Sequence, residues 1–343
     1  MKIKISKNIE IGGNRRPIIV AEISGNHKGQ KSKFLKLIKS AVINGADMVK
    51  IQTYSPEDIT INKKEPNFMI KDGIWKKKYL WDLYKKAHTP YSWHKDAFKL
   101  AKKLKIELFS SPFSKKSVDF LEKLNVKLYK LASFELTDLS LIDYIARKKK
   151  PIIISIGMGS FKEIDRALRQ IEKYHKKIII LFCVSGYPTK LEDANVNTIN
   201  KLKKKYKNYL IGLSDHTNDI TSSVAATSLG ACLIEKHFNL SKKNKTTDSE
   251  FSILPHQLKE LRKVSENIFL SLGKEFVGPK KAEKTSLRLR RSLFAIEDIK
   301  KGDKFSEKNI RAFRPKIGLG AENYFSLIGK KSKKLFKKGS PIY

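Results

Sequence analysis

The segment Tyr209–Phe238, YLIGLSDHTNDITSSVAATSLGACLIEKHF, contains two short apolar runs that each lead into a histidine. The run 210–213 precedes His216, the run 231–234 precedes His237, and residues 220–229 between them have helical spacing. Neighbouring parallel strands of a barrel open their carboxyl ends on the same face. The segment therefore predicts one strand–helix–strand unit with two imidazoles in one barrel mouth.

The same alternation of strand and helix runs along most of the chain. The predicted strands cover residues 18–21, 48–52, 107–110, 127–131, 151–155, 178–182, 210–213 and 231–236. Eight such repeats over about 250 residues are typical of an α/β protein with a (β/α)8 TIM barrel. An open doubly wound sheet is the rival, but no glycine-rich dinucleotide turn follows the first predicted strand.

Three segments depart from the repeat. The alternating residues 2–5 and 9–11 predict a hairpin that closes the lower end of the barrel, and residues 53–90 form a long insertion on the active face. A last barrel helix is expected over 255–272. We expect three parts: a barrel domain over 1–272, a linker over 273–287 and a small, turn-rich domain over 288–343.

Composition limits the classes of function. The 343 residues carry a formal net charge of +38, but lysines are spread over nearly every predicted helix rather than along one stripe, so we expect no nucleic-acid partner. Cys183 and Cys232 lie in apolar runs, which argues against disulfides and favours a reducing cytoplasm. No signal peptide or membrane-spanning stretch is recognisable, so no membrane partner is expected.

Polar side chains gather where the predicted strands end. Two imidazoles supply a common pair of ligands for Mn, Zn or Fe and leave coordination positions open, as in a catalytic metal site. The plain alternative is that His216 caps a turn and His237 packs in the core. Lysines that interrupt apolar strands, with hydroxyls around them, form a receptor for phosphate and carboxylate groups; lysines reaching out of the mouth are the alternative. The strand-end candidates are Glu22, Lys50, Gln52, Ser110, Ser111, Lys130, Ser133, Glu135, Ser155, Ser185 and Tyr187.

Six motifs, taken in order and spacing, resemble the sialic acid synthase family. They are AEISGNH at 21–27, GAD at 45–47 with KIQTY at 50–54, FSSPF at 109–113, YKLASFE at 129–135, LSDHT at 213–217 and IEKHF at 234–238. The tail, from RRSL at 290–293 to Arg314-Pro315, is similar to the family's antifreeze-like (SAF) domain. FMIKDGIW at 68–75, Leu83-Tyr84 and TPYSWH at 89–94 are most similar to the pseudaminic acid synthase branch.

The resemblance implies a chemistry for these residues. Phosphoenolpyruvate would condense with 2,4-diacetamido-2,4,6-trideoxy-L-altrose to give pseudaminic acid and phosphate with C–O cleavage. His216 and His237 would hold Mn²⁺ or Mg²⁺ and, with Glu22, form the catalytic group. Arg314 would reach the sugar's acetamido end from the partner subunit of a domain-swapped homodimer. The remaining substrate-binding residues are expected to be Lys50, Gln52, Ser111, Lys130, Ser133, Ser155, Ser185, Tyr187, Ser214 and Asp248.

Four alternatives stay open at this point. N-acetylneuraminate or legionaminate synthases would use N-acetylmannosamine or its 2,4-diacetamido-6-deoxy analogue instead. A Schiff-base aldolase could use Lys130 as its nucleophile. A non-catalytic binding module is disfavoured by the charged strand ends, and a nucleic-acid partner rests on the lysine excess alone.

Overall fold

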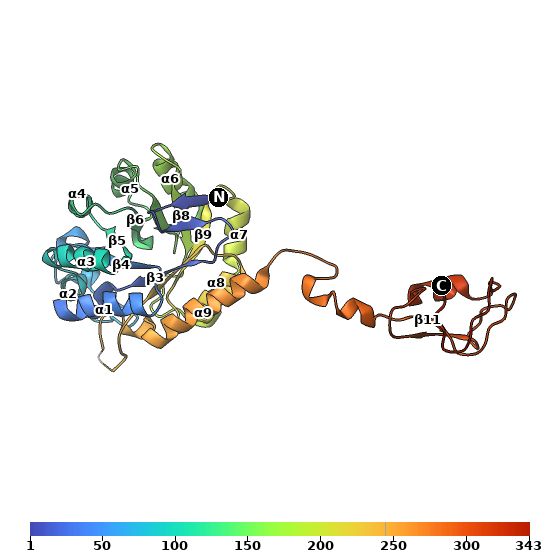
Figure 1. Cartoon of the computed structure of the whole chain (residues 1–343). Helices are drawn as coiled ribbons and strands as arrows, with labels where there is room; N and C mark the ends of the chain where they lie inside the picture. The colour runs from blue at the N-terminus through green and yellow to red at the C-terminus, as the bar shows by residue number, and fades with distance from the viewer. Residues whose placement is uncertain (244) are drawn as a thin grey trace. The chain divides into compact units, whose positions relative to one another are not determined.

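The computed structural model describes residues 1–243 and 245–343, and its first part is a closed barrel of eight parallel strands with helices around it (Figure 1). The strands pair in the ring order β10-β3-β4-β5-β6-β7-β8-β9. Their bounds are β3 Ile18–Glu22, β4 Met48–Thr53, β5 Glu107–Pro112, β6 Tyr129–Leu131, β7 Ile152–Ser155, β8 Ile178–Phe182, β9 Leu210–Asp215 and β10 Leu233–His237. The predicted barrel is confirmed.

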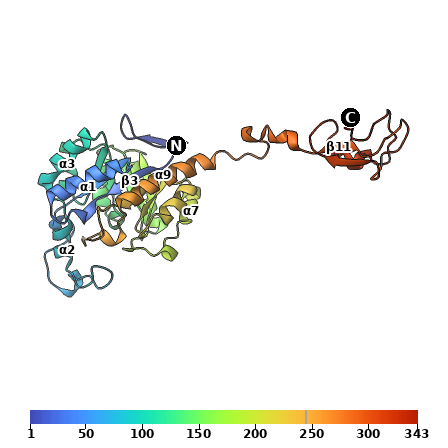
Figure 2. The same cartoon turned by 60° about the horizontal axis from the view of Figure 1, so that its bottom comes forward.

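Helices form the outer layer of the barrel, as both views show (Figures 1 and 2). They pack on strand residues that point outward, and the largest apolar cluster, which includes Phe34, Val49 and Ile234, lies in this layer. The helices of the first part are α1 Lys31–Ile43, α2 Leu80–Ala87, α3 Tyr91–Lys103, α4 Lys115–Lys123, α5 Leu139–Ala146, α6 Phe161–Glu172, α7 Thr198–Lys205, α8 Thr221–Ser228 and α9 Pro255–Leu272.

Five strands extend further at their carboxyl ends than the sequence predicted. β3, β4, β5, β9 and β10 run on to Glu22, Thr53, Pro112, Asp215 and His237. Apolarity alone stops each strand at its polar residues, but in a barrel those residues continue the ladder. Two of the added residues, the register partners Glu22 and His237, face the mouth. The predicted strands therefore ended too early at the mouth of the barrel, where the polar groups gather.

The barrel interior is layered by the two-residue period of its strands. The lower layers are apolar and hold Val20, Met48, Phe109 and Ile153, among others. The hairpin of β1 (Lys2–Lys4) and β2 (Glu10–Gly12) adds Ile3, Ile5 and Ile11 to the same cluster. The hairpin closes the amino-terminal end of the barrel, as predicted, so polar groups gather at the opposite end.

The chain divides into two compact units, Met1–Gly273 and Lys274–Tyr343. The second unit contains the antiparallel pair β11 (Ser292–Ala295) and β12 (Ile310–Phe313) and the short helix α10 (Tyr324–Leu327). Its own small core includes Leu293, Ile299 and Phe336. Among the described helices, none combines the length and apolarity that a bilayer crossing requires.

Candidate active site

A buried cluster of alternating charges lies just inside the barrel mouth. The Lys50 ammonium is 2.6 Å from Oε2 of Glu22 and 3.1 Å from Oε1 of Glu235, and the Lys130 ammonium is 4.0 Å from the same Glu235 oxygen. All four side chains are at most 4% exposed. Because they come from β3, β4, β6 and β10, the barrel brings together charges that lie far apart in sequence.

The two carboxylates of this cluster differ in their acidity. Burial raises the pKa of Glu22 to about 7, because the attraction of Lys50 offsets only part of the desolvation. Burial also acts against ionised Glu235, but Lys130 and Lys50 together outweigh it and lower its pKa. Burial lowers the pKa of Lys130, whereas the pKa of Lys50 is raised because its two carboxylates outweigh its own desolvation. Oε2 of Glu22 has the Lys50 ammonium as its partner, whereas Oε2 of Glu235 accepts no hydrogen bond within the described chain.

Hydroxyl groups surround the two lysines. The Lys130 ammonium donates to Oγ of Ser155 at 2.6 Å, and the Lys50 ammonium approaches Oγ of Ser111 at 3.4 Å. Ser214 donates to Glu235 at 3.2 Å. Ser133, at the start of the short helix η4 (Ser133–Glu135), and Ser185 share a hydrogen bond of 2.8 Å. Three of the predicted hydroxyls, those of Ser111, Ser155 and Ser214, therefore contact the charged cluster, and those of Ser133 and Ser185 pair with each other.

The two histidines stand side by side at the same mouth. Their ring centroids are 5.6 Å apart, and both side chains are buried. Nδ1 of His216 lies 2.8 Å from the carbonyl oxygen of Val184, so a proton on Nδ1 leaves Nε2 with a free lone pair. Nδ1 of His237 is buried without a hydrogen-bond partner, 4.0 Å from Oδ2 of Asp248.

These residues fit a divalent metal ion with an open coordination sphere. Desolvation lowers the pKa of His216 to about 4 and that of His237 well below its usual value, so both imidazoles are neutral at neutral pH. Neutral imidazole is the form that binds metals. Within residues 1–243 and 245–343, no set of three or more His, Cys, Asp or Glu side chains gathers as a ligand group. A metal held by this pair would keep several positions for small molecules.

Aromatic side chains form a wall beside the histidines. The Tyr187 ring is 4.4 Å from the His216 ring, and the Phe251 ring is 4.8 Å from the His237 ring. Trp75, from the insertion, lies 5.6 Å from Tyr187, and its indole N–H donates to the carbonyl oxygen of Thr247 at 3.0 Å. The insertion thus reaches the site through Trp75, while Phe68, Ile70 and Ile74 are half-buried on the insertion itself.

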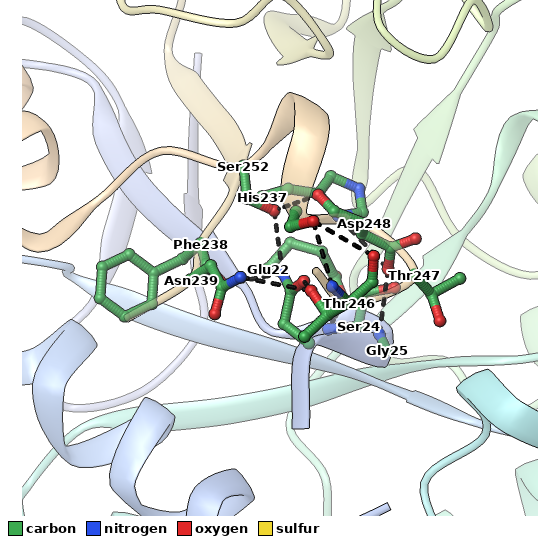
Figure 3. A network of polar contacts seen from close by, with 12 residues as sticks. Glu22, Ser24, Gly25, His237, Phe238, Asn239, Thr246, Thr247, Asp248 and Ser252 are labelled. Carbon is green, nitrogen blue, oxygen red and sulfur yellow. Dashed lines mark hydrogen bonds and ion pairs between the residues drawn. The ribbon is translucent and has the colours of Figure 1, made fainter. Parts of the chain in front are cut away.

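Asp248 is held beside His237 by the loop that follows β3, as Figure 3 shows. The Gly25 N–H donates to Oδ2 of Asp248 at 3.0 Å, and burial raises the pKa of this carboxyl. The buried Asn26 amide donates to the carbonyl oxygen of Phe238 and to Ser252, whose hydroxyl donates to the Asp248 carbonyl. These bonds fix the carboxylate at the rim of the mouth.

Comparison with known proteins agrees with this geometry. The sequence profile of the NeuB family matches residues 37–276, and that of the SAF domain matches residues 290–343. The chain belongs to the NeuB family. It is 42% identical to a pseudaminic acid synthase of Helicobacter pylori over 95% of this chain and 96% of the relative. It is 35% identical to an N,N'-diacetyllegionaminic acid synthase of Campylobacter jejuni, over 96% of this chain and 99% of that one.

A solved structure is similar to this NeuB-family enzyme over most of its length. An N-acetylneuraminic acid synthetase from Leptospira borgpetersenii, determined in complex with citrate, superposes with a TM-score of 0.75 at 30% identity. The match covers 84% of this chain and 95% of that one. The predicted family and fold, including the SAF domain, are confirmed.

Sequence reasoning missed two residues of the NeuB-family site. Glu235 contacts both lysines, and Phe251, in the short helix η6 (Ser249–Phe251), contacts both histidines. The strand period could have identified Glu235, because an inward His237 requires an inward residue two positions earlier. Phe251 lies after a loop, where no period applies.

The other predicted residues fall in two groups. Gln52 is half-buried near the end of β4, in register with Ser111, and so lies at the mouth. Arg314 is exposed in the second unit, in the loop after β12. Its predicted contact with the sugar requires the barrel of a partner subunit.

Proposed function

We propose that this enzyme condenses phosphoenolpyruvate with 2,4-diacetamido-2,4,6-trideoxy-L-altrose to give pseudaminic acid and phosphate. The observation that carries the proposal is the presence of two buried lysines, hydrogen-bonded to serines, in the same barrel mouth as two neutral histidines. The relative from Helicobacter pylori named pseudaminic acid synthase supports the choice of reaction.

The lysines and serines would bind phosphoenolpyruvate. Lys50 and Lys130 supply positive charge, and the hydroxyls of Ser111, Ser155 and Ser214, which contact the charged cluster, supply directional donors. Ser133 and Ser185, which share a hydrogen bond, and Gln52, the register partner of Ser111, would add further polar groups to this surface. A small dianion or trianion would replace the carboxylates of Glu22 and Glu235 as partner of the ammonium groups.

His216 and His237 would hold the divalent ion, Mn²⁺ or Mg²⁺. When bound, the ion supplies Lewis-acid polarisation of the carbonyl oxygen of the open-chain sugar. Asp248 and Tyr187, at the rim, would hold the sugar hydroxyls.

The bonds then change as follows. C3 of the enol forms a bond to C1 of the sugar while the C1=O π bond breaks, which leaves an oxocarbenium at C2. A water molecule adds to C2; one of its protons ends on the C1 oxygen, and the other leaves with the phosphate. Phosphate leaves C2 with its bridging oxygen, so that the C–O bond breaks and the C2 carbonyl forms. Glu22 is held by the Ser24 N–H and the Lys50 ammonium, and burial raises its pKa to about 7, so its carboxylate would orient the water and take up its proton.

The substrate preference is the finer part of the proposal. We expect kcat/KM for the 2,4-diacetamido-2,4,6-trideoxy-L-altrose to exceed that for N-acetylmannosamine by at least about 10-fold, because Trp75, Tyr187 and Phe251 favour a methyl over a hydroxymethyl group. A group of this size in an apolar pocket discriminates by about 1–3 kcal/mol.

Steady-state kinetics with purified sugars measures this directly. A preference for N-acetylmannosamine would place the enzyme with the neuraminate synthases. A preference for the 2,4-diacetamido-6-deoxy mannose analogue would place it with the legionaminate synthases, to which the 35% identical relative belongs. The first outcome would mean that the aromatic residues merely pack the insertion onto the rim, whereas the second would keep their preference for a methyl group.

We also propose that Arg314 acts on the barrel of a partner subunit in a domain-swapped homodimer. The observation behind this is that Arg314 is exposed on a compact unit separate from the barrel. Mixing an Arg314→Ala protein with a His237→Ala protein should restore activity toward about a quarter of the wild-type level, because random exchange makes half of the dimers hybrid and each hybrid has one intact site.

Subunit exchange must be demonstrated in the same sample, by mass spectrometry of differently tagged chains. A mixture that exchanges and stays as inactive as its parents would show that Arg314 does not act across an interface.

A further inference from the structure

An ion pair is buried directly behind the two histidines. Asp215 precedes His216 and Lys236 precedes His237, and these two residues are register partners on β9 and β10. Because successive side chains of a strand alternate, the histidines face the mouth while Asp215 and Lys236 face the helix layer. The Lys236 ammonium is 3.0 Å from Oδ2 of Asp215, and the side chains are 0% and 1% exposed.

Both members of the ion pair form hydrogen bonds with Thr217, the residue that follows His216. Oδ1 of Asp215 accepts hydrogen bonds from the Thr217 N–H and hydroxyl, both at 2.8 Å, and the Lys236 ammonium donates to the Thr217 carbonyl oxygen. Oδ2 of Asp215 accepts from the hydroxyl of Ser223 in α8 at 2.6 Å. Both peptide groups of Thr217 are thus tied to the pair.

Three connections restrain the positions of the two histidines. His216 is fixed in front by its bond to the Val184 carbonyl and behind by the clamp on Thr217. His237 is attached to the other ion of the pair through one peptide bond. A buried ion pair is a weak source of stability, since an apolar pair of similar volume is often as stable. Its consequence here is geometric: it fixes the ends of β9 and β10 relative to each other.

We propose that Asp215 and Lys236 are positioning residues that set the separation and orientation of the His216 and His237 rings for a divalent metal ion. The inference rests on the proposed function, because it assumes that the two rings hold a metal. Hydrogen bonds behind metal ligands typically change metal affinity by about 10- to 100-fold. The pair touches the ligands through the backbone alone, so its effect should appear in metal affinity rather than in the binding of phosphoenolpyruvate.

The test compares Mn²⁺ binding by the full-length protein and its variants, measured by calorimetry and by electron paramagnetic resonance of free Mn²⁺. The double variant Asp215→Asn/Lys236→Met removes both charges together and leaves no unpaired buried ion. We expect its Mn²⁺ dissociation constant to rise by about 10- to 100-fold, while fluorescence quenching by phosphoenolpyruvate shows a dissociation constant within about threefold of wild type.

The matched control is Arg16→Met, which removes an ion pair to Asp47 of 2.6 Å at the other end of the barrel. It should leave Mn²⁺ affinity unchanged even if it lowers the melting temperature by as much as the double variant does. If the double variant fails to fold, Thr217→Val removes the hydroxyl between the two ions, retains both charges, and should weaken Mn²⁺ binding severalfold.

The outcomes separate the two claims. A wild-type protein that does not bind Mn²⁺ or Mg²⁺ would overturn the proposed metal site and the positioning role together. Metal binding by the wild type, with unchanged affinity in a folded variant, would overturn the positioning role alone. A loss of metal affinity equal to that of Arg16→Met would mean that the pair acts through general stability.

Discussion

Replacing His216 or His237 by alanine is expected to abolish turnover, with kcat reduced by about 10³-fold or more. Each histidine supplies one of two imidazoles whose ring centroids lie 5.6 Å apart, and one imidazole is too few to retain a divalent ion. The loss of activity should occur without loss of the fold, because both rings lie at the mouth, above the apolar layers that stabilise the barrel.

Activity assays in added Mn²⁺, with circular dichroism as the check on folding, measure this effect. The exposed His256 in α9 offers a matched control, and His256→Ala should keep full activity. EDTA should mimic the two mutants, and Mn²⁺ should restore activity to the chelated wild type alone. Full activity of thoroughly chelated enzyme would contradict the assignment of a metal to this pair.

Replacing Lys130 by methionine is expected to lower kcat/KM for phosphoenolpyruvate by roughly 30- to 1,000-fold. Its ammonium is buried beside Ser155 and Glu235, and a bound anion would lose a charge-assisted hydrogen bond where water cannot replace it. The range corresponds to about 2–4 kcal/mol, which is typical of truncating one partner of a buried, hydrogen-bonded charge pair.

Lys36→Met is the control for charge alone, since Lys36 is exposed on α1 and its loss should change kcat/KM by less than about twofold. Lys130 also allows a test between the proposed condensation and a Schiff-base aldolase mechanism. Burial lowers its pKa, which is the shift that a Schiff-base lysine needs. Borohydride in the presence of pyruvate should leave Lys130 unmodified, and a trapped adduct on Lys130 would favour the aldolase alternative.

Much of the fold could be predicted because each strand carries its own signal. Residues such as Ile178–Phe182 are apolar on both faces, as strands covered by helices outside and packed inside must be. The hairpin over 2–12 was also predictable, since Ile3 and Ile11 alternate with charged residues and need one apolar surface to cover. Residue spacing could not determine where the strands end, because polar residues extend them into the mouth.

The site was predictable where a residue type is unusual for its place. Lys50 and Lys130 interrupt apolar strands, which signals a buried charge with partners. Glu235 could be predicted only by counting two residues back from His237, because side chains two positions apart on β10 point the same way. Asp215 and Lys236 look like surface residues in sequence, and their pairing depends on the register of two strands separated by α8. Such a register is a property of the closed barrel rather than of either segment.

The most direct test of the account is one incubation of Mn²⁺-loaded enzyme with 2,4-diacetamido-2,4,6-trideoxy-L-altrose and phosphoenolpyruvate labelled with ¹⁸O at the bridging oxygen. Products are identified by NMR and mass spectrometry. We predict pseudaminic acid and phosphate in equal amounts, with the ¹⁸O in the phosphate because the C–O bond breaks. Release of phosphate without a nine-carbon sugar acid, or ¹⁸O retained in the sugar acid, would contradict the account.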